Sequence, residues 1–355
     1  MCFSNEYISK DLPFHNLVDY DVSNEFVSSK LRIQNLMNEN GFQDFMRNNK
    51  LNKIFNYKSP DICGYYDEDM IEKLNNNPDT SLNILSLNIR SLPKHDGVLT
   101  CLLDILKMHY QVIVLTEIGS RNLTTVEHLM PNYSFIYDIP ENNQKGGVGI
   151  YFSDSLKSVS QEDKVNKTCE CSECEIESAC INFIFGQSKY TIAGIYRHPG
   201  GKVPHFVHDL ECFISKLDKT RTCILAGDIN INIINYDGKN EINYLTMLLS
   251  SRFLPHIIVP SRITDTSATC IDHIFVRKSY KDNHIQSKAG LIYSDISDHL
   301  PCFISLCTQR EHGLDRPWTR IFVEKNNAIF IQTLSSTNWD DVYKNSPKKI
   351  CTVYM

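Results

Sequence analysis

An aspartate and an asparagine two positions apart, Asp228 and Asn230, stand directly after an apolar run at residues 223–226. The run predicts a buried strand, and Gly227 allows the backbone to turn sharply where the strand ends. At the two-residue period of a strand the carboxylate and the amide share a face, so they project together from the edge of a sheet. A carboxylate beside an amide could form part of a polar site, whereas in isolation the same residues suit an Asx-stabilised turn.

Further polar residues hold similar places at the ends of other apolar runs, or within them. They are Asn88 after 82–87, Glu117 after 112–115, Tyr196 and Arg197 after 190–195, Asp272 within 270–276, and Ser297, Asp298 and His299 before 302–306. Polar groups at strand ends can converge at one edge of a layered sheet, where sites are commonly built. Taken singly, each also has a plain structural explanation as a solvated charge, a buried hydrogen-bond acceptor or a turn.

The hydrophobic periodicity predicts the elements that must position these residues. Strands are expected near 82–88, 112–115, 133–137, 147–152, 181–185, 190–196, 223–226, 270–276, 290–293 and 302–306, and helices near 98–109, 204–217 and 241–250. Several strands are adjacent pairs, as at 133–152, where residues 142–146 suit a turn. This order predicts a mixed α/β layered domain from about 82 to 308.

The composition is that of a core-forming protein without a global preference for polyanions. Of 355 residues, 42% are hydrophobic, and the formal net charge is −6. No apolar run is long enough to span a bilayer and no secretory signal is visible, which predicts a nuclear or cytoplasmic protein with mostly reduced thiols among its 13 cysteines. A nucleic-acid partner would need a local basic surface or bound cations.

The remaining segments contain few residues that suggest a catalytic or binding role. Residues 1–81 predict a polar, loosely ordered leader with a helix around 25–48, and residues 309–355 predict an extension with a helix around 326–334. Four cysteines, Cys169, Cys171, Cys174 and Cys180, accompany an acidic segment. Thiolates this close together can bind zinc, but the spacing differs from that of common zinc modules, and an exposed hairpin is the alternative.

Six motifs in order resemble those of a known family. They are SLNIRSL, LTEIG, GIYRHP, LAGDIN, CIDHIF and SDISDHLP. Together they resemble the endonuclease/exonuclease/phosphatase superfamily, and particularly the apurinic-endonuclease-like domain of non-LTR (LINE-type) retrotransposons. The resemblance covers about 82–308 and implies a four-layer, DNase I-like fold, in which two packed, mostly antiparallel β-sheets are flanked by helices.

The resemblance also implies roles for the matching residues. Glu117 and Asn88 are the expected ligands of Mg²⁺, with Mn²⁺ as an alternative, and Asp298 is expected to assist the metal or the histidine. Asp228 would activate the attacking water and Asn230 would hold it. His299 would contact the scissile phosphate while Asp272 keeps its ring charged, and Tyr196 would donate its hydroxyl to a phosphate oxygen.

Three further residues, Arg197, Ser297 and Arg262, are expected to contact DNA. Arg262 lies in loop 260–269, which could equally be a surface hairpin; loops 142–146 and 197–203 are the other candidates for target recognition. The chain departs from many abasic-site enzymes at Arg90, where those enzymes have an acid that touches metal-bound water. This departure favours the retroelement branch.

The function expected from the resemblance is Mg²⁺-dependent nicking of double-stranded DNA to leave a 3′-hydroxyl, by a monomer that uses no membrane. In the family such a nick primes reverse transcription of the element's RNA. No Y/F-x-D-D motif of a reverse transcriptase is visible, so residues 309–355 are expected to begin a linker to an absent reverse transcriptase. The alternatives are an inositol or lipid phosphodiesterase or phosphatase of the same superfamily, and a catalytically inert retroelement remnant.

Overall fold

The computed structural model describes residues 63–74, 81–119, 129–139, 145–161, 176–234, 238–264, 267–282, 285–307, 331–332 and 335–336. The chain divides into two compact units, Met1–Arg310 and Glu311–Met355, and all the elements named below belong to the first. The helix expected around 25–48, the three cysteines at 169–174 and most of the C-terminal extension lie outside the described residues. In the described part of the chain, no helix is both long and apolar enough to cross a membrane.

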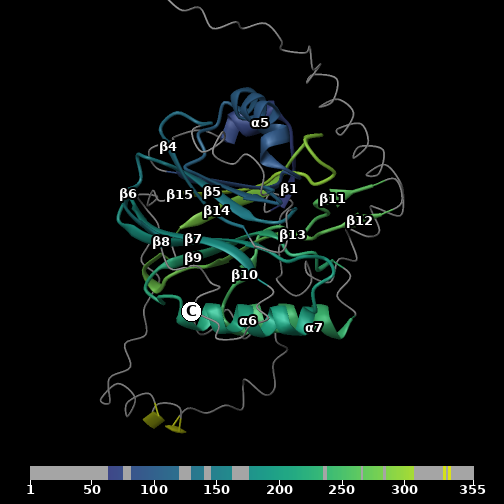
Figure 1. The fold of residues 1–355 in the computed structure, drawn as a ribbon. Helices are drawn as coiled ribbons and strands as arrows, with labels where there is room; N and C mark the ends of the chain where they lie inside the picture. Colours follow the sequence, from purple (N-terminus) through teal and green to yellow (C-terminus); the bar gives the residue numbers. More distant parts are fainter. Residues whose placement is uncertain are drawn as a thin grey trace, which may run out of the picture. The chain divides into compact units, whose positions relative to one another are not determined.

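One sheet has seven strands in the spatial order β1-β14-β15-β2-β3-β5-β4 (Figure 1). Its members are β1 (Cys63–Tyr66), β2 (Ser81–Asn88), β3 (Val112–Thr116), β4 (Tyr133–Asp138), β5 (Val148–Ser153), β14 (Gln286–Ile292) and β15 (Cys302–Cys307). The pairs β1–β14 and β2–β3 are parallel, and the other four pairs are antiparallel.

The second sheet has six strands in the order β10-β13-β9-β8-β7-β6. They are β6 (Lys157–Gln161), β7 (Glu177–Phe185), β8 (Ser188–Tyr196), β9 (Thr222–Asp228), β10 (Leu254–Pro255) and β13 (Asp272–Arg277). Only β8 and β9 pair in parallel. A separate two-stranded hairpin joins β11 (Arg262–Ile263) to β12 (Ala268–Thr269).

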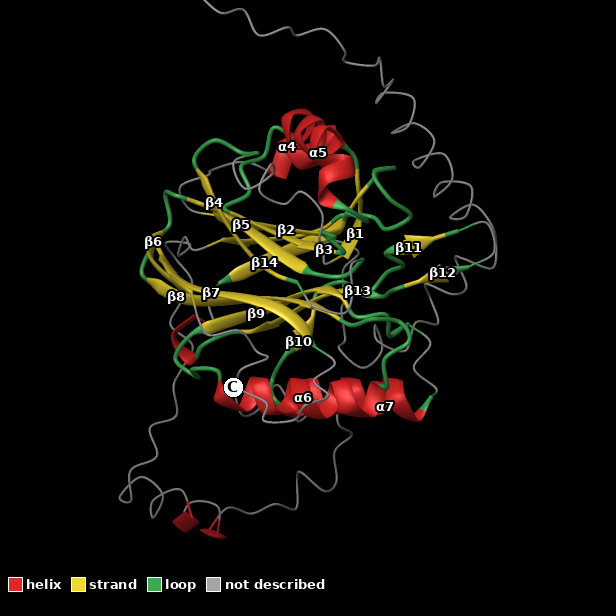
Figure 2. Ribbon diagram, in the orientation of Figure 1, coloured by secondary structure: helices red, strands yellow, loops and turns green. Residues whose placement is uncertain are grey.

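Helices cover the outer face of each sheet (Figure 2). Helices α4 (Glu68–Leu74) and α5 (Leu92–Leu106) lie over the seven-stranded sheet, whereas α6 (Val203–Lys216) and α7 (Lys239–Ser250) lie over the six-stranded sheet. A short 3-10 helix, η3 (Tyr280–Asp282), follows β13. The expected four-layer arrangement of two packed, mostly antiparallel sheets between helices is confirmed.

The alternation of side chains along the central strands explains the layers. In β2, Ile84 belongs to the cluster that includes the facing sheet, whereas Leu85 belongs to the cluster under α4 and α5. Val114 and Ile113 divide in the same way in β3. Because successive side chains of a strand point to opposite faces, a strand buried on both sides must be apolar throughout, which matches the continuous runs in the sequence.

The domain was predicted to start at residue 82, but part of the predicted leader belongs to its fold. Strand β1 lies within residues 1–81, and it pairs in parallel with β14 from Cys63↔Ala289 to Tyr66↔Ile292. Ile71 of α4 is fully buried in the cluster beneath the helices. The four-residue strand was missed because CGYY is too short for its period to be distinguished from that of a loop.

Gly227 does not end its strand as predicted, because β9 continues through Asp228. The residue has φ +143°, and a Cβ atom placed on it would lie 2.0 Å from the carbonyl oxygen of Ile195. The glycine therefore allows β8 to approach β9 closely at the point where their regular pairing stops, after Gly194↔Ala226. This close approach sets the position of the next residue, Asp228.

We expect Gly227→Ala to lower the free energy of unfolding by about 3 kcal/mol or more, because the added methyl group must displace backbone in a strained conformation. Gly97→Ala in α5 is the matched control, since a Cβ atom there meets nothing within 4 Å. That variant should gain about 0.5–1 kcal/mol from helix propensity. Urea unfolding of both variants measures the difference, and equal stabilities would contradict the explanation.

Candidate active site

Two buried aspartates face each other across neighbouring strands. Asp228 of β9 is the register partner of Asp272 of β13. Their exposed fractions are 1% and 3%. Directly opposed residues of an antiparallel pair point to the same face, so two carboxylates come together at one end of the six-stranded sheet.

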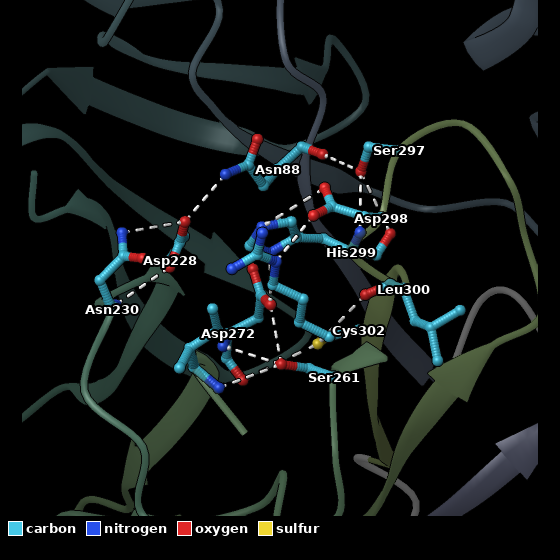
Figure 3. A network of polar contacts seen from close by, with 12 residues as sticks. Asn88, Asp228, Asn230, Ser261, Asp272, Ser297, Asp298, His299, Leu300 and Cys302 are labelled. Carbon is cyan, nitrogen blue, oxygen red and sulfur yellow. Dashed lines mark hydrogen bonds and ion pairs between the residues drawn. The ribbon is translucent and has the colours of Figure 1, made fainter. Parts of the chain in front are cut away.

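Three N–H groups hold Asp228. The side-chain Nδ2 of Asn88, at the end of β2 in the other sheet, donates to Asp228 Oδ2 over 2.8 Å. Asn230 donates through its backbone N to Oδ1 over 3.0 Å and through Nδ2 to Oδ2 over 3.2 Å. Asn230 has φ +53°, a conformation that asparagine adopts more readily than most residues. The two sheets are thus joined at the carboxylate (Figure 3).

Burial raises the pKa of Asp228 to about 7, and the negative charge of Asp272 adds to this effect. The charge of His299 and the hydrogen bonds from Asn88 and Asn230 act in the opposite direction without cancelling the rise. A carboxylate with a pKa near neutrality is suited to accept a proton from water.

His299 lies beside this pair and is oriented by Asp272. Its Nδ1 is 2.8 Å from Asp272 Oδ2, which also accepts a hydrogen bond from Ser261 Oγ over 2.7 Å. Burial of the ring disfavours its charged form, but the adjacent Asp272 carboxylate outweighs it and the pKa of His299 rises to about 9. With Nδ1–H directed at Asp272, the second N–H of the charged ring is left to donate to a substrate oxygen.

Ser297 and Asp298 close the turn before His299. Ser297 Oγ donates to the backbone oxygen of Asn88 over 2.7 Å and accepts from the backbone N of His299 over 3.1 Å, so its hydroxyl ties the turn to β2. Asp298 forms ion pairs with Arg90 and Arg262. The predicted DNA contact of Ser297 and the predicted help of Asp298 to a metal stay predictions, and in the structure both residues position their neighbours.

Glu117 and Tyr196 form a second group next to Asp228. The Tyr196 hydroxyl donates to Glu117 Oε1 over 3.2 Å. Burial, and then the charges of Glu117 and Asp228, raise the pKa of Tyr196, so the hydroxyl stays a protonated donor. Glu117 follows β3 with φ +53°, an uncommon conformation that directs a residue out of a strand and that is frequent at functional sites.

Arg197 is placed differently from the prediction. It is 3% exposed, and its guanidinium donates to the carbonyl oxygens of His198, Gly201, Ile229 and Asn230. The prediction that Arg197 contacts DNA is therefore wrong. The side chain instead fixes the segment that holds Asn230, whose Nδ2 donates back to the Arg197 oxygen over 2.9 Å.

The donors of the site fit a divalent cation. Asp228, Asp272 and His299 have ligand atoms within 4.8 Å of one another, but His299 Nδ1 is already directed at Asp272 Oδ2, 2.8 Å away. Glu117 and Asn88 fit better, since only one Glu117 oxygen accepts a hydrogen bond from a described residue and the Asn88 amide oxygen accepts only from the Arg90 N, over 3.2 Å. Oxygen donors of this kind are those that Mg²⁺ takes.

With this geometry described, the comparison with protein families is decisive. The model of the Endonuclease/Exonuclease/phosphatase family matches residues 80–299, more than half of the chain. The chain belongs to this family. Its members hydrolyse phosphate esters and phosphodiesters and generally depend on a divalent metal. The recognition made from the six motifs is confirmed.

Several solved structures are similar to this chain. An AP endonuclease of Leishmania major, LMAP, is 13% identical with a TM-score of 0.53, over 66% of this chain and 90% of that one. The endonuclease domain of TRAS1, a telomere-specific non-LTR retrotransposon, is 14% identical with a TM-score of 0.48, over 65% and 100%. A mannosyl-6-phosphatase of Bacteroides thetaiotaomicron is 15% identical with a TM-score of 0.49, over 63% and 99%. Among curated proteins no significant match is found.

Three residues of the site escaped the sequence argument. Ser261 orients Asp272, Arg90 pairs with Asp298, and Glu177 Oε2 accepts from the backbone N of Gly147 over 2.6 Å while its charge acts on Tyr196. Arg90 lies within the SLNIRSL motif and Ser261 within loop 260–269, so their positions in the sequence were a usable signal. Glu177 begins β7 with no motif around it, and only its pairing with Tyr196 places it here.

Proposed function

We propose that this chain is a Mg²⁺-dependent endonuclease that nicks double-stranded DNA and leaves a 3′-hydroxyl. The observation that carries the proposal is the buried group of Asp228, Asp272 and His299, in which Asn88 and Asn230 orient the Asp228 carboxylate and Asp272 orients the His299 ring. Burial raises the pKa of Asp228, and the Asp272 carboxylate raises the pKa of His299. A base and a charged hydrogen-bond donor can then exist side by side, which is the arrangement that acid–base hydrolysis needs.

Each residue would have a separate role in the in-line hydrolysis of the phosphodiester. Asp228, oriented by Asn88 and Asn230, takes a proton from the attacking water, whose oxygen forms the new bond to phosphorus while the bond to O3′ breaks. The charged ring of His299 donates a hydrogen bond to a phosphate oxygen, and Tyr196 supplies a second donor. A divalent cation held by Glu117 and Asn88 would supply further neutralisation of the phosphate. O3′ takes a proton from solvent water and leaves as the alcohol.

Two observations support DNA as the substrate. The six sequence motifs resemble those of the retroelement branch, and an AP endonuclease is among the structures that share this fold. A nick that leaves a 3′-hydroxyl would serve as a primer for reverse transcription, which is the role we propose.

Removing divalent metal is expected to lower the rate of plasmid nicking at least about 100-fold, because the phosphate charge is then less neutralised. The full chain is incubated with supercoiled plasmid and Mg²⁺, with and without chelator, and conversion to open circles is followed. Readdition of Mg²⁺ should restore the rate, and a DNA polymerase should extend the nick directly if it carries a 3′-hydroxyl.

Two outcomes oppose the proposal. Hydrolysis of an inositol phosphate without any nicking would indicate a phosphatase or lipid-type phosphodiesterase. Absence of both activities would indicate an inert remnant. Nicking that persists both in chelator and in an Asp228→Asn, His299→Gln double variant would come from a contaminating nuclease.

A further inference from the structure

Two arginines at the edge of the site share one carboxylate. Arg90 Nη2 lies 2.8 Å from Asp298 Oδ1 and 2.9 Å from Oδ2, and Arg262 Nε lies 2.7 Å from Oδ2. The three residues come from the loop after β2, the start of β11 and the turn before β15. One carboxylate neutralises one guanidinium, so this group, the Arg90–Asp298–Arg262 cluster, keeps a net charge of +1.

The cluster is open to solvent, unlike Arg197. The side chains of Arg90, Arg262 and Asp298 are 44%, 37% and 24% exposed. Within the described residues, the two terminal nitrogens of Arg262 donate to no protein group. A guanidinium with unused donors at a surface is suited to bind a phosphate through paired hydrogen bonds.

The cluster adjoins the reacting centre without occupying it. Asp298 Oδ1 is 3.9 Å from His299 Nε2, the nitrogen to which the proposed function assigns the scissile phosphate. Arg262 pairs with His299 in an isolated antiparallel bridge, and the backbone N of Arg90 donates to Asn88 Oδ1 over 3.2 Å. Both guanidiniums are therefore anchored to Asp298, the residue directly before His299 in the chain.

Because the chain is acidic overall, the position of the Arg90–Asp298–Arg262 cluster matters for binding a nucleic acid. A protein of net charge −6 attracts no polyanion globally, and the buried site itself contains Asp228 and Asp272. Affinity for a nucleic-acid strand must then come from local cations, since contacts to phosphates supply most of such affinity. Along one strand phosphates recur every ~3.4 Å of helix axis, so a group beside His299 is close to the neighbour of the scissile phosphate.

We propose that Arg90 and Arg262, held in place by Asp298, bind a phosphate adjacent to the scissile one. They thereby make the site selective for a nucleic-acid strand over an ester with a single phosphate. This proposal rests on the proposed function and names how its substrate class is chosen. Asp298 acts as a positioning residue that fixes the two guanidiniums before the substrate arrives, which lowers the entropy lost on binding.

The test compares Arg90→Gln and Arg262→Gln with the unaltered full chain. Each variant should raise the KM for plasmid nicking about 10-fold and reduce the slope of log KM against log salt concentration by about one, since each removes one phosphate contact. The preference for plasmid over bis(p-nitrophenyl) phosphate, a diester with one phosphate, should fall by a similar factor. Lys107→Gln, at the exposed end of α5 and 64% exposed, is the matched control and should change neither quantity.

Asp298→Asn separates this role from a purely structural one. Asp298→Asn keeps both guanidinium charges but loses the carboxylate that fixes them. The KM for DNA should therefore rise less than in either arginine variant, and the slope of log KM against log salt concentration should not fall. If all three variants raise KM alike, the arginines merely hold Asp298 and the proposal is overturned. An unchanged KM and salt slope in both arginine variants also overturns it, while failure of the unaltered protein to nick DNA overturns the proposed function itself.

Discussion

Asp228→Asn is expected to lower kcat for plasmid nicking by about 1000-fold, the loss typical of a removed general base. Asparagine cannot accept a proton from water, yet it has nearly the same shape. Its single carbonyl oxygen can still accept hydrogen bonds from Asn88 and Asn230, which hold the carboxylate now. The KM for DNA should change little, because Asp228 is 1% exposed and its proposed partner is the attacking water rather than the strand.

The same substitution should not destabilise the fold at pH 8. Burial and the charge of Asp272 oppose ionisation of Asp228, so a neutral amide relieves a repulsion that the charged form must bear. We therefore expect an equal or higher free energy of unfolding at pH 8. Asp104→Asn, on the exposed face of α5, is the control for the loss of a negative charge. Nicking by Asp228→Asn within tenfold of the unaltered rate would remove Asp228 from the role of base.

Asp228 and Asn230 could be assigned to the candidate site from sequence because local periodicity places them at the end of a strand. Asp228 and Asn230 follow an apolar run, and that run does form a strand buried along its whole length. The partners of these residues could not be derived in this way. Asp272 faces Asp228 only because β13 pairs with β9, and Asn88 reaches Asp228 from the other sheet, 140 residues away in the chain. Such pairings depend on packing over the whole domain, which only the family resemblance supplied.

Arginine was the residue type that sequence reasoning placed worst. Arg197 follows a strand as an exposed, DNA-binding arginine would, but the loop at 198–201 and the segment after β9 surround its guanidinium with carbonyl oxygens. Arg90 was noticed only as a departure from related enzymes, whereas it pairs with Asp298, 208 residues away. A charged side chain is at the surface by default, and long-range partners decide the exceptions.

The largest effect after that of Asp228 is expected from the His299–Asp272 pair. His299→Gln should lower kcat about 1000-fold, because the charged donor to the phosphate is lost. Asp272→Asn should lower kcat by a similar factor and also change the pH dependence. The pKa of His299 lies near 9 chiefly because the Asp272 carboxylate outweighs burial. Without that charge the basic limit of activity should move down towards or below about 6.5, the ordinary value for histidine.

The proposed roles of Asp228 and His299 decide whether the rate rises or falls as the pH passes the pKa of each residue. Activity requires Asp228 deprotonated, so the rate rises with pH through about 7, and it requires His299 protonated, so the rate falls through about 9. The profile of log kcat/KM against pH for the unaltered chain is thus expected to be bell-shaped with its maximum near pH 8. In Asp272→Asn the removed charge also lowers the pKa of Asp228, so the whole bell should narrow and move to lower pH. A profile that moves at only the acidic limit would show that Asp272 acts on Asp228 alone, and that His299 does not work as a charged donor.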